Sequence, residues 1–294
     1  MTARHVSLPT NYRTADIITW HVRDPLPVSE KWENNTLHKG LMWQGRPACL
    51  TLHFQDGQVQ AALHTDQGEV AVPQFASMVH NVLGLNQDIE RFEHAVRDHP
   101  ELGPLVQRQQ GLRVPIAASP FEALVWAIVG QQISVQAAIA IRRRFVQAVG
   151  RTHPGGLWCH PDPAMVAAAP SDTLRAAGLS AAKVHTLHTV SRAIADGTLI
   201  WPDTLDSDHA PALQEALMRV RGIGVWTADY TLLRGYGWLD GSLHGDAAVR
   251  RSLRTLLQRD APITADDART WLLPFSPWRA LAAAHLWAAL RVQA

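Results

Sequence analysis

The segment ALQEALMRVRGIGVWTADYTLLRGYG, residues 212–237, decides the fold of the region around it. Apolar residues recur at helical spacing up to Val220 and again from Trp226, which predicts two helices. The short stretch between them contains Gly222 and Gly224, and glycine permits both a tight turn and close approach of a ligand to the backbone. The amides of such a turn and of the next helix start lack intrahelical partners, so they favour a phosphate oxygen. A plain connector between two packed helices is an equally good interpretation of this hairpin taken alone.

Helical patterns continue on both sides of the hairpin. Ser119, Pro120 and Glu122 have the spacing of an N-cap, a first helical residue and a capping partner. Gly130 interrupts the run that they open, so residues 119–150 form either two helices or one kinked helix. Two helices joined at Gly178 are predicted over 171–197, and single helices over 210–220, 224–236, 246–260, 264–273 and 276–292. Residues 115–294 are therefore predicted to form a helical domain.

The first 114 residues have a different pattern. Residues 15–24, 47–57 and 58–65 are β-branched or alternating, which predicts strands, and Asp56-Gly57 between two of them is typical of a hairpin turn. A helix is predicted over 75–85, and another with Asn86 as a possible cap. Residues 112–115 break the pattern at a proline. We expect an α+β domain with an antiparallel sheet over 1–114, and the sequence assigns no chemistry to it.

Composition limits the class of protein. The 294 residues carry a net charge of +1, divided into −2 over 1–114 and +3 over 115–294, so a polyanion-binding surface belongs in the helical half. Two cysteines, Cys49 and Cys159, are too few for a disulfide framework or a four-cysteine cluster. Fifteen histidines occur without a tight metal-ligand spacing. No signal peptide or membrane-spanning run is visible, which predicts a cytoplasmic protein.

Several ordered motifs carry a resemblance to a known family. The hairpin LMRVRGIGVWTA resembles the helix-hairpin-helix of DNA repair glycosylases, and LHGDAAVRR resembles the segment with their catalytic aspartate. Residues 127–134, 174–183, 277–279 and 285–287 are similar to further family segments, in the same order. The spacing suits the AlkA type, DNA-3-methyladenine glycosylase II. The match covers residues 112–294 strongly and the first domain loosely.

The resemblance implies a monofunctional glycosylase of base excision repair. Such an enzyme flips an alkylated purine such as 3-methyladenine out of double-stranded DNA and hydrolyses the N-glycosidic bond, leaving an abasic site. No cofactor is required and a monomer is expected. The resemblance also implies that the helical domain, residues 115–294, has two lobes and that the cleft between them holds Asp246.

Asp246 is the catalytic residue that the resemblance implies. Taken alone, its position before Ala-Ala-Val-Arg is typical of a helix N-cap, and the two roles are compatible. Cleavage of a glycosidic bond builds positive charge on the sugar, which a fixed carboxylate stabilises.

Three aromatic residues, Trp226, Tyr230 and Trp287, line the base pocket if the resemblance holds, and core packing is their alternative role. Each ring offers a face on which a flipped base stacks, and an electron-deficient alkylated purine gains a cation–π contribution. In bifunctional relatives a lysine stands at the position of Trp226 and attacks the sugar. Its absence here implies hydrolysis without a Schiff base.

DNA contacts are implied at Gln132, where the family inserts a side chain into the gap left by the flipped base, and at Gly222, Ile223 and Gly224. The backbone carbonyls of Met218, Val220 and Ile223 correspond to a monovalent-cation site in relatives. Two arginine runs, 142–144 and 250–251, are either phosphate contacts or solvated helix faces. His244 is more typical of a structural residue than of a proton donor.

Two other functions compete. A bifunctional glycosylase/lyase of the endonuclease III kind is disfavoured by Trp226 at the lysine position and by the missing cysteine cluster. A non-catalytic hairpin module that binds DNA is disfavoured by Asp246, by the aromatic positions and by the length of the match.

Overall fold

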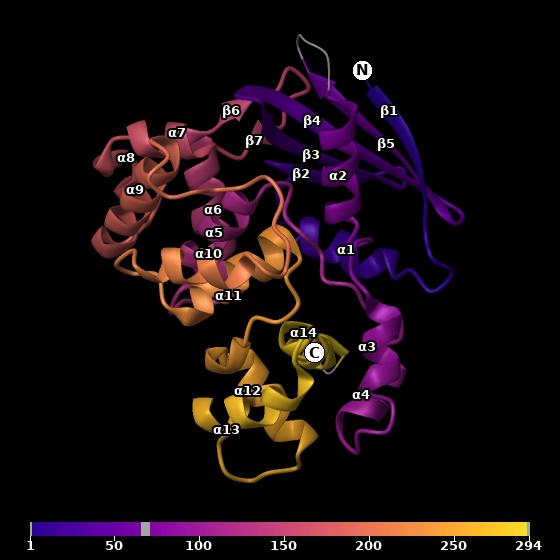
Figure 1. Cartoon of the computed structure of the whole chain (residues 1–294). Helices are drawn as coiled ribbons and strands as arrows, with labels where there is room; N and C mark the ends of the chain where they lie inside the picture. Colours follow the sequence, from indigo (N-terminus) through magenta and orange to yellow (C-terminus); the bar gives the residue numbers. More distant parts are fainter. Residues whose placement is uncertain (1, 66–70, 293–294) are drawn as a thin grey trace.

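The first part of the chain forms a five-stranded antiparallel sheet in the computed structural model, which describes residues 2–65 and 71–292 (Figure 1). The strand order is β1-β5-β4-β3-β2. The predicted turn at Asp56-Gly57 is confirmed, because Gln55 pairs with Gln58 and Gly57 has a φ of 69°. The strands are β1 (Thr2–Ser7), β2 (Glu30–Glu33), β3 (Thr36–Trp43), β4 (Arg46–Gln55) and β5 (Gln58–Thr65).

The strand predicted over residues 15–24 is wrong. Helix α1 (Thr14–His21) occupies this segment, and its buried side chains, Ile17 and His21, are four residues apart. That spacing places them on one helical face, and packing of this face outweighs the β propensity of the β-branched residues. Strands β1, β2 and β3 were not predicted.

Helix α2 (Val72–Val82) lies against the sheet (Figure 1). Its buried Phe75 and Val79 share one hydrophobic core with Leu37, Leu50 and Leu63 of the strands. This first core is closed between α2 and the sheet.

The N-cap of helix α3 (Ile89–Ala95) lies two residues beyond the expected cap at Asn86. The carboxylate of Asp88, not the side chain of Asn86, accepts the hydrogen bond from the Arg91 amide. The Asn86 amide donates instead to the Asn81 side chain at 2.8 Å. The N-cap is the residue whose side chain reaches the free amides of the first turn. Asn and Asp are equally favourable there, so residue type alone does not distinguish Asn86 from Asp88.

Helices α3 and α4 (Leu102–Arg108) pack with the helical part of the chain, not with the sheet. The Phe92 ring lies 6.1 Å from the Trp278 ring and 5.4 Å from that of His285, between ring centroids. The hydrophobic cores therefore divide between α2 and α3, ahead of the expected boundary near residue 114.

The remaining chain is helical, as predicted. The Ser119 hydroxyl accepts a hydrogen bond from the Glu122 amide, with Pro120 at the first helical position, which confirms the predicted cap. The run that follows is two helices, because Ser134 caps a second one after Gly130. The helices are α5 (Pro120–Gly130), α6 (Val135–Val149), α7 (Pro163–Ala168), α8 (Ser171–Ala176), α9 (Ala181–Ala195), α10 (Ala210–Met218), α11 (Val225–Tyr236), α12 (Ala247–Leu256), α13 (Ala265–Leu272) and α14 (Arg279–Val292), with short elements β6 (Arg151–Thr152), β7 (Trp158–Cys159), η1 (Leu243–Gly245) and η2 (Leu273–Phe275).

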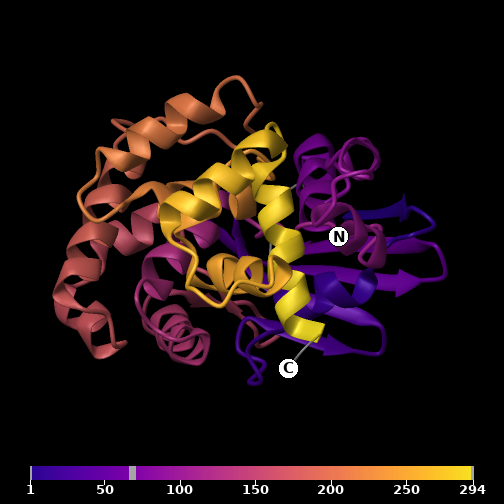
Figure 2. The same cartoon turned by 90° about the horizontal axis from the view of Figure 1, so that it is seen from below.

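The C-terminal helix has a central place in this arrangement. Seen from below, the yellow helix α14 lies in the middle of the view, between the orange and pink helices and the indigo strands (Figure 2). Within residues 2–65 and 71–292, none of the helices combines the length and the apolar composition that a membrane crossing requires.

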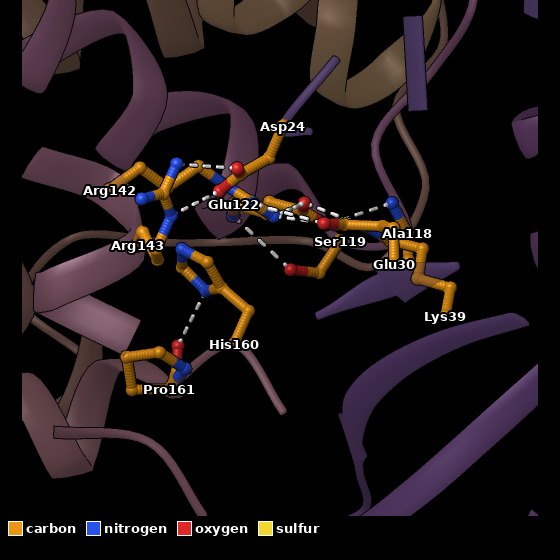
Figure 3. A network of polar contacts seen from close by, with 10 residues as sticks. All are labelled: Asp24, Glu30, Lys39, Ala118, Ser119, Glu122, Arg142, Arg143, His160 and Pro161. Atoms are coloured by element: carbon orange, nitrogen blue, oxygen red, sulfur yellow. Dashed lines mark hydrogen bonds and ion pairs between the residues drawn. The ribbon is translucent and has the colours of Figure 1, made fainter. Parts of the chain in front are cut away.

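A buried network of four charges joins the sheet to the helices (Figure 3). The Lys39 ammonium lies 2.6 Å from Glu30 and 2.7 Å from Glu122, and Arg142 lies 2.6 Å and 2.8 Å from the same carboxylates. Burial alone raises the pKa of Glu30, but Arg142 and Lys39 outweigh it and lower that pKa to about 2. Removing one member would leave an uncompensated buried charge, so the four act as one unit.

The arginine run 142–144 is a solvated face only in part: Arg142 is buried and Arg143 is partly buried, whereas Arg144 is exposed and lies on a solvated face. Arg142 belongs to the buried network, Arg143 donates to both oxygens of Asp24, and Arg144 donates to the Ala177 carbonyl. Arg142 and Arg143 are covered because their acidic partners, Glu30 and Asp24, come from a distant part of the sequence.

Candidate active site

Asp246 lies where α11, α12 and α14 meet, and both of its oxygens accept hydrogen bonds. As the cap of α12, its Oδ1 accepts from the amides of Ala248 and Val249 at 2.8 Å and 2.9 Å. The indole N–H of Trp226 donates to Oδ2 at 2.9 Å, and that of Trp287 donates to Oδ1 at 3.1 Å. Four N–H donors from three helices therefore fix the orientation of a carboxylate that is only partly buried.

The three predicted pocket residues lie together beside this carboxylate. The rings of Trp226 and Tyr230 have centroids 5.4 Å apart, and those of Tyr230 and Trp287 are 6.1 Å apart. Tyr230 is 8% exposed and packs in the core, whereas the two tryptophans are partly exposed. Trp226 and Trp287 therefore combine contact with the Asp246 carboxylate with partial exposure to solvent.

The three hairpin residues differ in the space around them and in the backbone amides that they leave free for an anion. Gly222 has a φ of 94°, and a Cβ there would overlap the Thr186 hydroxyl, so packing requires this glycine. Gly224 is the exposed N-cap of α11, and a Cβ there would meet nothing within 4 Å. Ile223 buries its side chain, and its amide already donates to the Val220 carbonyl at 3.0 Å. The amides left for an anion are those at the start of α11.

The predicted cation ligands are the backbone oxygens of Met218, the last residue of α10, and of Val220 and Ile223 in the turn that follows. The Val220 carbonyl accepts one hydrogen bond, from Ile223, and a carbonyl oxygen has a second lone pair. The Val220 oxygen can therefore accept one further contact. Among the described residues no group of three His, Cys, Asp or Glu side chains has the arrangement of a metal site.

The loop between α5 and α6 faces the hairpin, and Gln131 is the residue that joins them. Its side-chain amide donates to the Gly222 carbonyl and to the Thr227 hydroxyl, both at 2.9 Å. Gln132 is exposed and has a φ of 58°, in the left-handed region that few non-glycine residues adopt. The sequence singled out Gln132 and missed Gln131, because two adjacent glutamines carry no signal of which one packs inward.

Lys183 supports the same loop. Its ammonium donates to the carbonyls of Val129 and Gln131, both at 2.8 Å, at the end of α5. Burial lowers the pKa of this lysine. Of the other two lysines in the sequence, Lys39 belongs to the buried network and Lys31 pairs with Glu33 at 2.6 Å.

A buried carboxyl, Asp229, lies under the segment that leads to Asp246. Its Oδ1 accepts a short hydrogen bond from Gln214, and a Cβ at Gly241 would press against its side chain. Burial raises the pKa of Asp229 to about 6, against the lowering effect of the Gln214 hydrogen bond. Sequence reasoning did not single out this residue, since an Asp within a helix has no distinctive pattern.

His244 has a structural contact next to the site. Its Nδ1 lies 2.9 Å from the carbonyl of Ser242 and 3.0 Å from the hydroxyl of the same residue. The small cavity lined by Phe121, His160 and Trp201 lies apart from the site and includes none of the predicted site residues.

Comparison with known families agrees with this architecture. A model described as HhH-GPD superfamily base excision DNA repair protein matches residues 125–273, and the AlkA N-terminal domain matches residues 6–119. The DNA-3-methyladenine glycosylase 2 of Escherichia coli (strain K12) is 33% identical over 189 residues, covering 63% of each protein. The DNA-3-methyladenine glycosylase of Bacillus subtilis (strain 168) is 26% identical over 215 residues, covering 72% of this chain and 71% of that protein.

Solved structures show the same fold over nearly the whole chain. The 3-methyladenine DNA glycosylase from Archaeoglobus fulgidus superposes with a TM-score of 0.82 at 20% identity, covering 98% of both chains. Mag1 of Schizosaccharomyces pombe, solved in complex with abasic DNA, superposes with a TM-score of 0.58 at 24% identity, covering 67% of this chain and 95% of that one. With a family model over half of the sequence and the AlkA domain before it, the chain belongs to the AlkA-type DNA-3-methyladenine glycosylases of the HhH-GPD superfamily.

Proposed function

We propose that Asp246 is the catalytic residue of a hydrolytic reaction that removes alkylated purines from double-stranded DNA. The observation that carries this proposal is the carboxylate held by two backbone amides and by the indoles of Trp226 and Trp287. A carboxylate fixed in advance stabilises the positive charge that develops on the sugar as the glycosidic bond breaks. Water then completes the reaction, leaving a free base and an abasic site.

The aromatic residues bind the flipped base in this proposal. Trp226 and Trp287 present partly exposed rings beside Tyr230, and stacking on ring faces suits alkylated purines, whose electron-deficient rings gain a cation–π contribution. The same indoles hold Asp246, so the binding of the base and the placement of the carboxylate are coupled.

The reaction proceeds without a covalent imine. Trp226 stands where a nucleophilic lysine would be needed, and the amine of Lys183 is committed to two carbonyl oxygens. This arrangement supports a monofunctional enzyme over a glycosylase/lyase.

DNA is held by backbone groups of the hairpin in the same proposal. The free amides at the start of α11 take a phosphate oxygen, Gln132 enters the gap left by the flipped base, and the carbonyls of Met218, Val220 and Ile223 hold a monovalent cation. The exposed Gly224 and the exposed, left-handed Gln132 support this placement.

Duplex DNA treated with a methylating agent provides the test. Free 3-methyladenine should appear in the supernatant, strands should break only after alkali treatment of the abasic sites, and borohydride should trap no protein–DNA adduct. Strand scission together with a trapped adduct would support the lyase alternative. DNA binding without base release would support the non-catalytic module.

A further inference from the structure

Arg23 belongs to the N-terminal part of the chain but lies against side chains of the helical part. Its Cζ is 3.7 Å from the ring centroid of Trp126 in α5 and 4.4 Å from that of Trp20 in α1. Arg23 as a residue is partly exposed, and among the described residues none accepts a hydrogen bond from its guanidinium. Because guanidinium N–H groups point outward in its plane, a stacked guanidinium keeps its donors available at its edge.

The Arg23 stack is continuous with the aromatic residues of the proposed base pocket. Arg234 lies 5.2 Å from the Trp20 centroid and also 5.9 Å and 5.4 Å from those of Tyr230 and Trp287. Burial lowers the pKa of Arg23, and Tyr230 is the group that opposes this effect most. Trp20 therefore contacts both guanidinium groups and connects the Arg23 stack, through Arg234, to the rings of Tyr230 and Trp287.

We propose that Arg23 is a specificity-determining residue that contacts the flipped base and favours neutral purines with hydrogen-bond acceptors on their edge over cationic methylated purines. Hypoxanthine, with a carbonyl oxygen and a ring nitrogen as acceptors, represents the favoured class. The nucleoside of 3-methyladenine carries a positive charge and represents the other. This inference rests on the proposed function, because it needs a base bound among the three aromatic rings.

Two physical effects act in the same direction. A guanidinium remains protonated in proteins, so its charge repels a cationic base in a site of low dielectric. The same charge strengthens a hydrogen bond to a neutral acceptor. Stacking by the tryptophans does not separate the two classes to this extent, because every base has a ring face.

Excision of both bases by one set of variants tests the inference. Duplexes with a single hypoxanthine and methylated duplexes that release 3-methyladenine are the substrates, and the readout is the ratio of the two kcat/KM values. Since both rates come from one preparation, a loss of folded protein cancels in the ratio. We expect Arg23→Gln to lower the hypoxanthine to 3-methyladenine ratio about tenfold, the scale of one charge-assisted hydrogen bond.

Two further variants separate charge from geometry and position. Arg23→Lys keeps the charge but loses the planar fork, so hypoxanthine excision should fall while 3-methyladenine excision does not rise. Arg13→Gln is the matched control, because Arg13 adjoins the same helix and pairs with Asp16 at 2.6 Å, and it should leave the ratio unchanged.

Each remaining outcome is decisive. An unchanged ratio in Arg23→Gln, or a wild-type protein that releases 3-methyladenine but no hypoxanthine, overturns the role of Arg23 and leaves the proposed function standing. A folded wild-type protein that releases neither base overturns both.

Discussion

Trp226 and Asp246 are joined by a hydrogen bond of 2.9 Å from the indole N–H to Oδ2. Trp287 makes the equivalent bond of 3.1 Å to Oδ1. The rings proposed to stack on the base are thus the same groups that orient the carboxylate, and a change in one affects the other.

Asp246→Asn should reduce base excision by at least about 100-fold, the scale seen when a preorganised electrostatic group is removed. The amide oxygen can still accept from Ala248 and Val249, so the cap of α12 persists and the protein should fold. Single-turnover release of 3-methyladenine measures the effect, and binding to a duplex with an abasic-site analogue is the control. Near-normal excision by the folded variant would exclude Asp246 as the catalytic residue.

Trp226→Phe keeps an aromatic face but removes the donor to Oδ2. We expect kcat to fall about tenfold with little change in KM, because a hydrogen bond to a charged group is lost while stacking remains. Trp226→Ala should in addition raise KM. If Trp226→Phe instead raised KM and left kcat unchanged, the indole would serve binding alone.

Gly224→Ala gives a clean test of the phosphate site. A Cβ there meets no neighbour within 4 Å and φ is −97°, so the melting temperature should fall only slightly. Affinity for damaged and undamaged duplex should fall together, because phosphate contacts do not read bases. Gly222→Ala is the contrasting variant, since overlap with Thr186 and a φ of 94° should lower stability itself. Unchanged affinity in folded Gly224→Ala would remove the start of α11 from the DNA interface.

Stability should fall as the pH drops from 7 to 5. Burial lowers the pKa of His21 to about 3 and that of His160 to about 4, below the value near 6.5 of an unfolded histidine. A pKa lowered by folding gives stability that is present above pH 6.5 and is lost as the pH approaches the folded value. For His160 this amounts to about 2 kcal/mol between pH 7 and 5.

Melting curves of His160→Gln across this range measure the contribution. The variant should depend less on pH than the wild-type protein, and His209→Gln, whose side chain is 76% exposed, should behave like wild type. Equal pH dependence in all three proteins would show that His160 does not titrate on unfolding.

Local patterns predicted the helical part well, because caps and breaks such as Ser119 and Gly130 act within a few residues. The segment 15–24 was mispredicted because its helix depends on burial of Ile17 and His21 against distant elements. At the site, motifs located Asp246 and the aromatic rings. Contacts such as those of Gln131 with Gly222 and of Arg23 with Trp126 join residues about 90 to 100 positions apart, and no local pattern records them.

Each side of the buried four-charge network is electrically neutral by itself. Glu30 and Lys39 both come from the sheet, and Glu122 and Arg142 both come from the helices. Without the sheet, Glu122 and Arg142 would still be in contact at 2.8 Å, so neither charge would lack an opposite partner. The four residues therefore hold the sheet to the helices without either side bringing a net charge of its own into the buried interface.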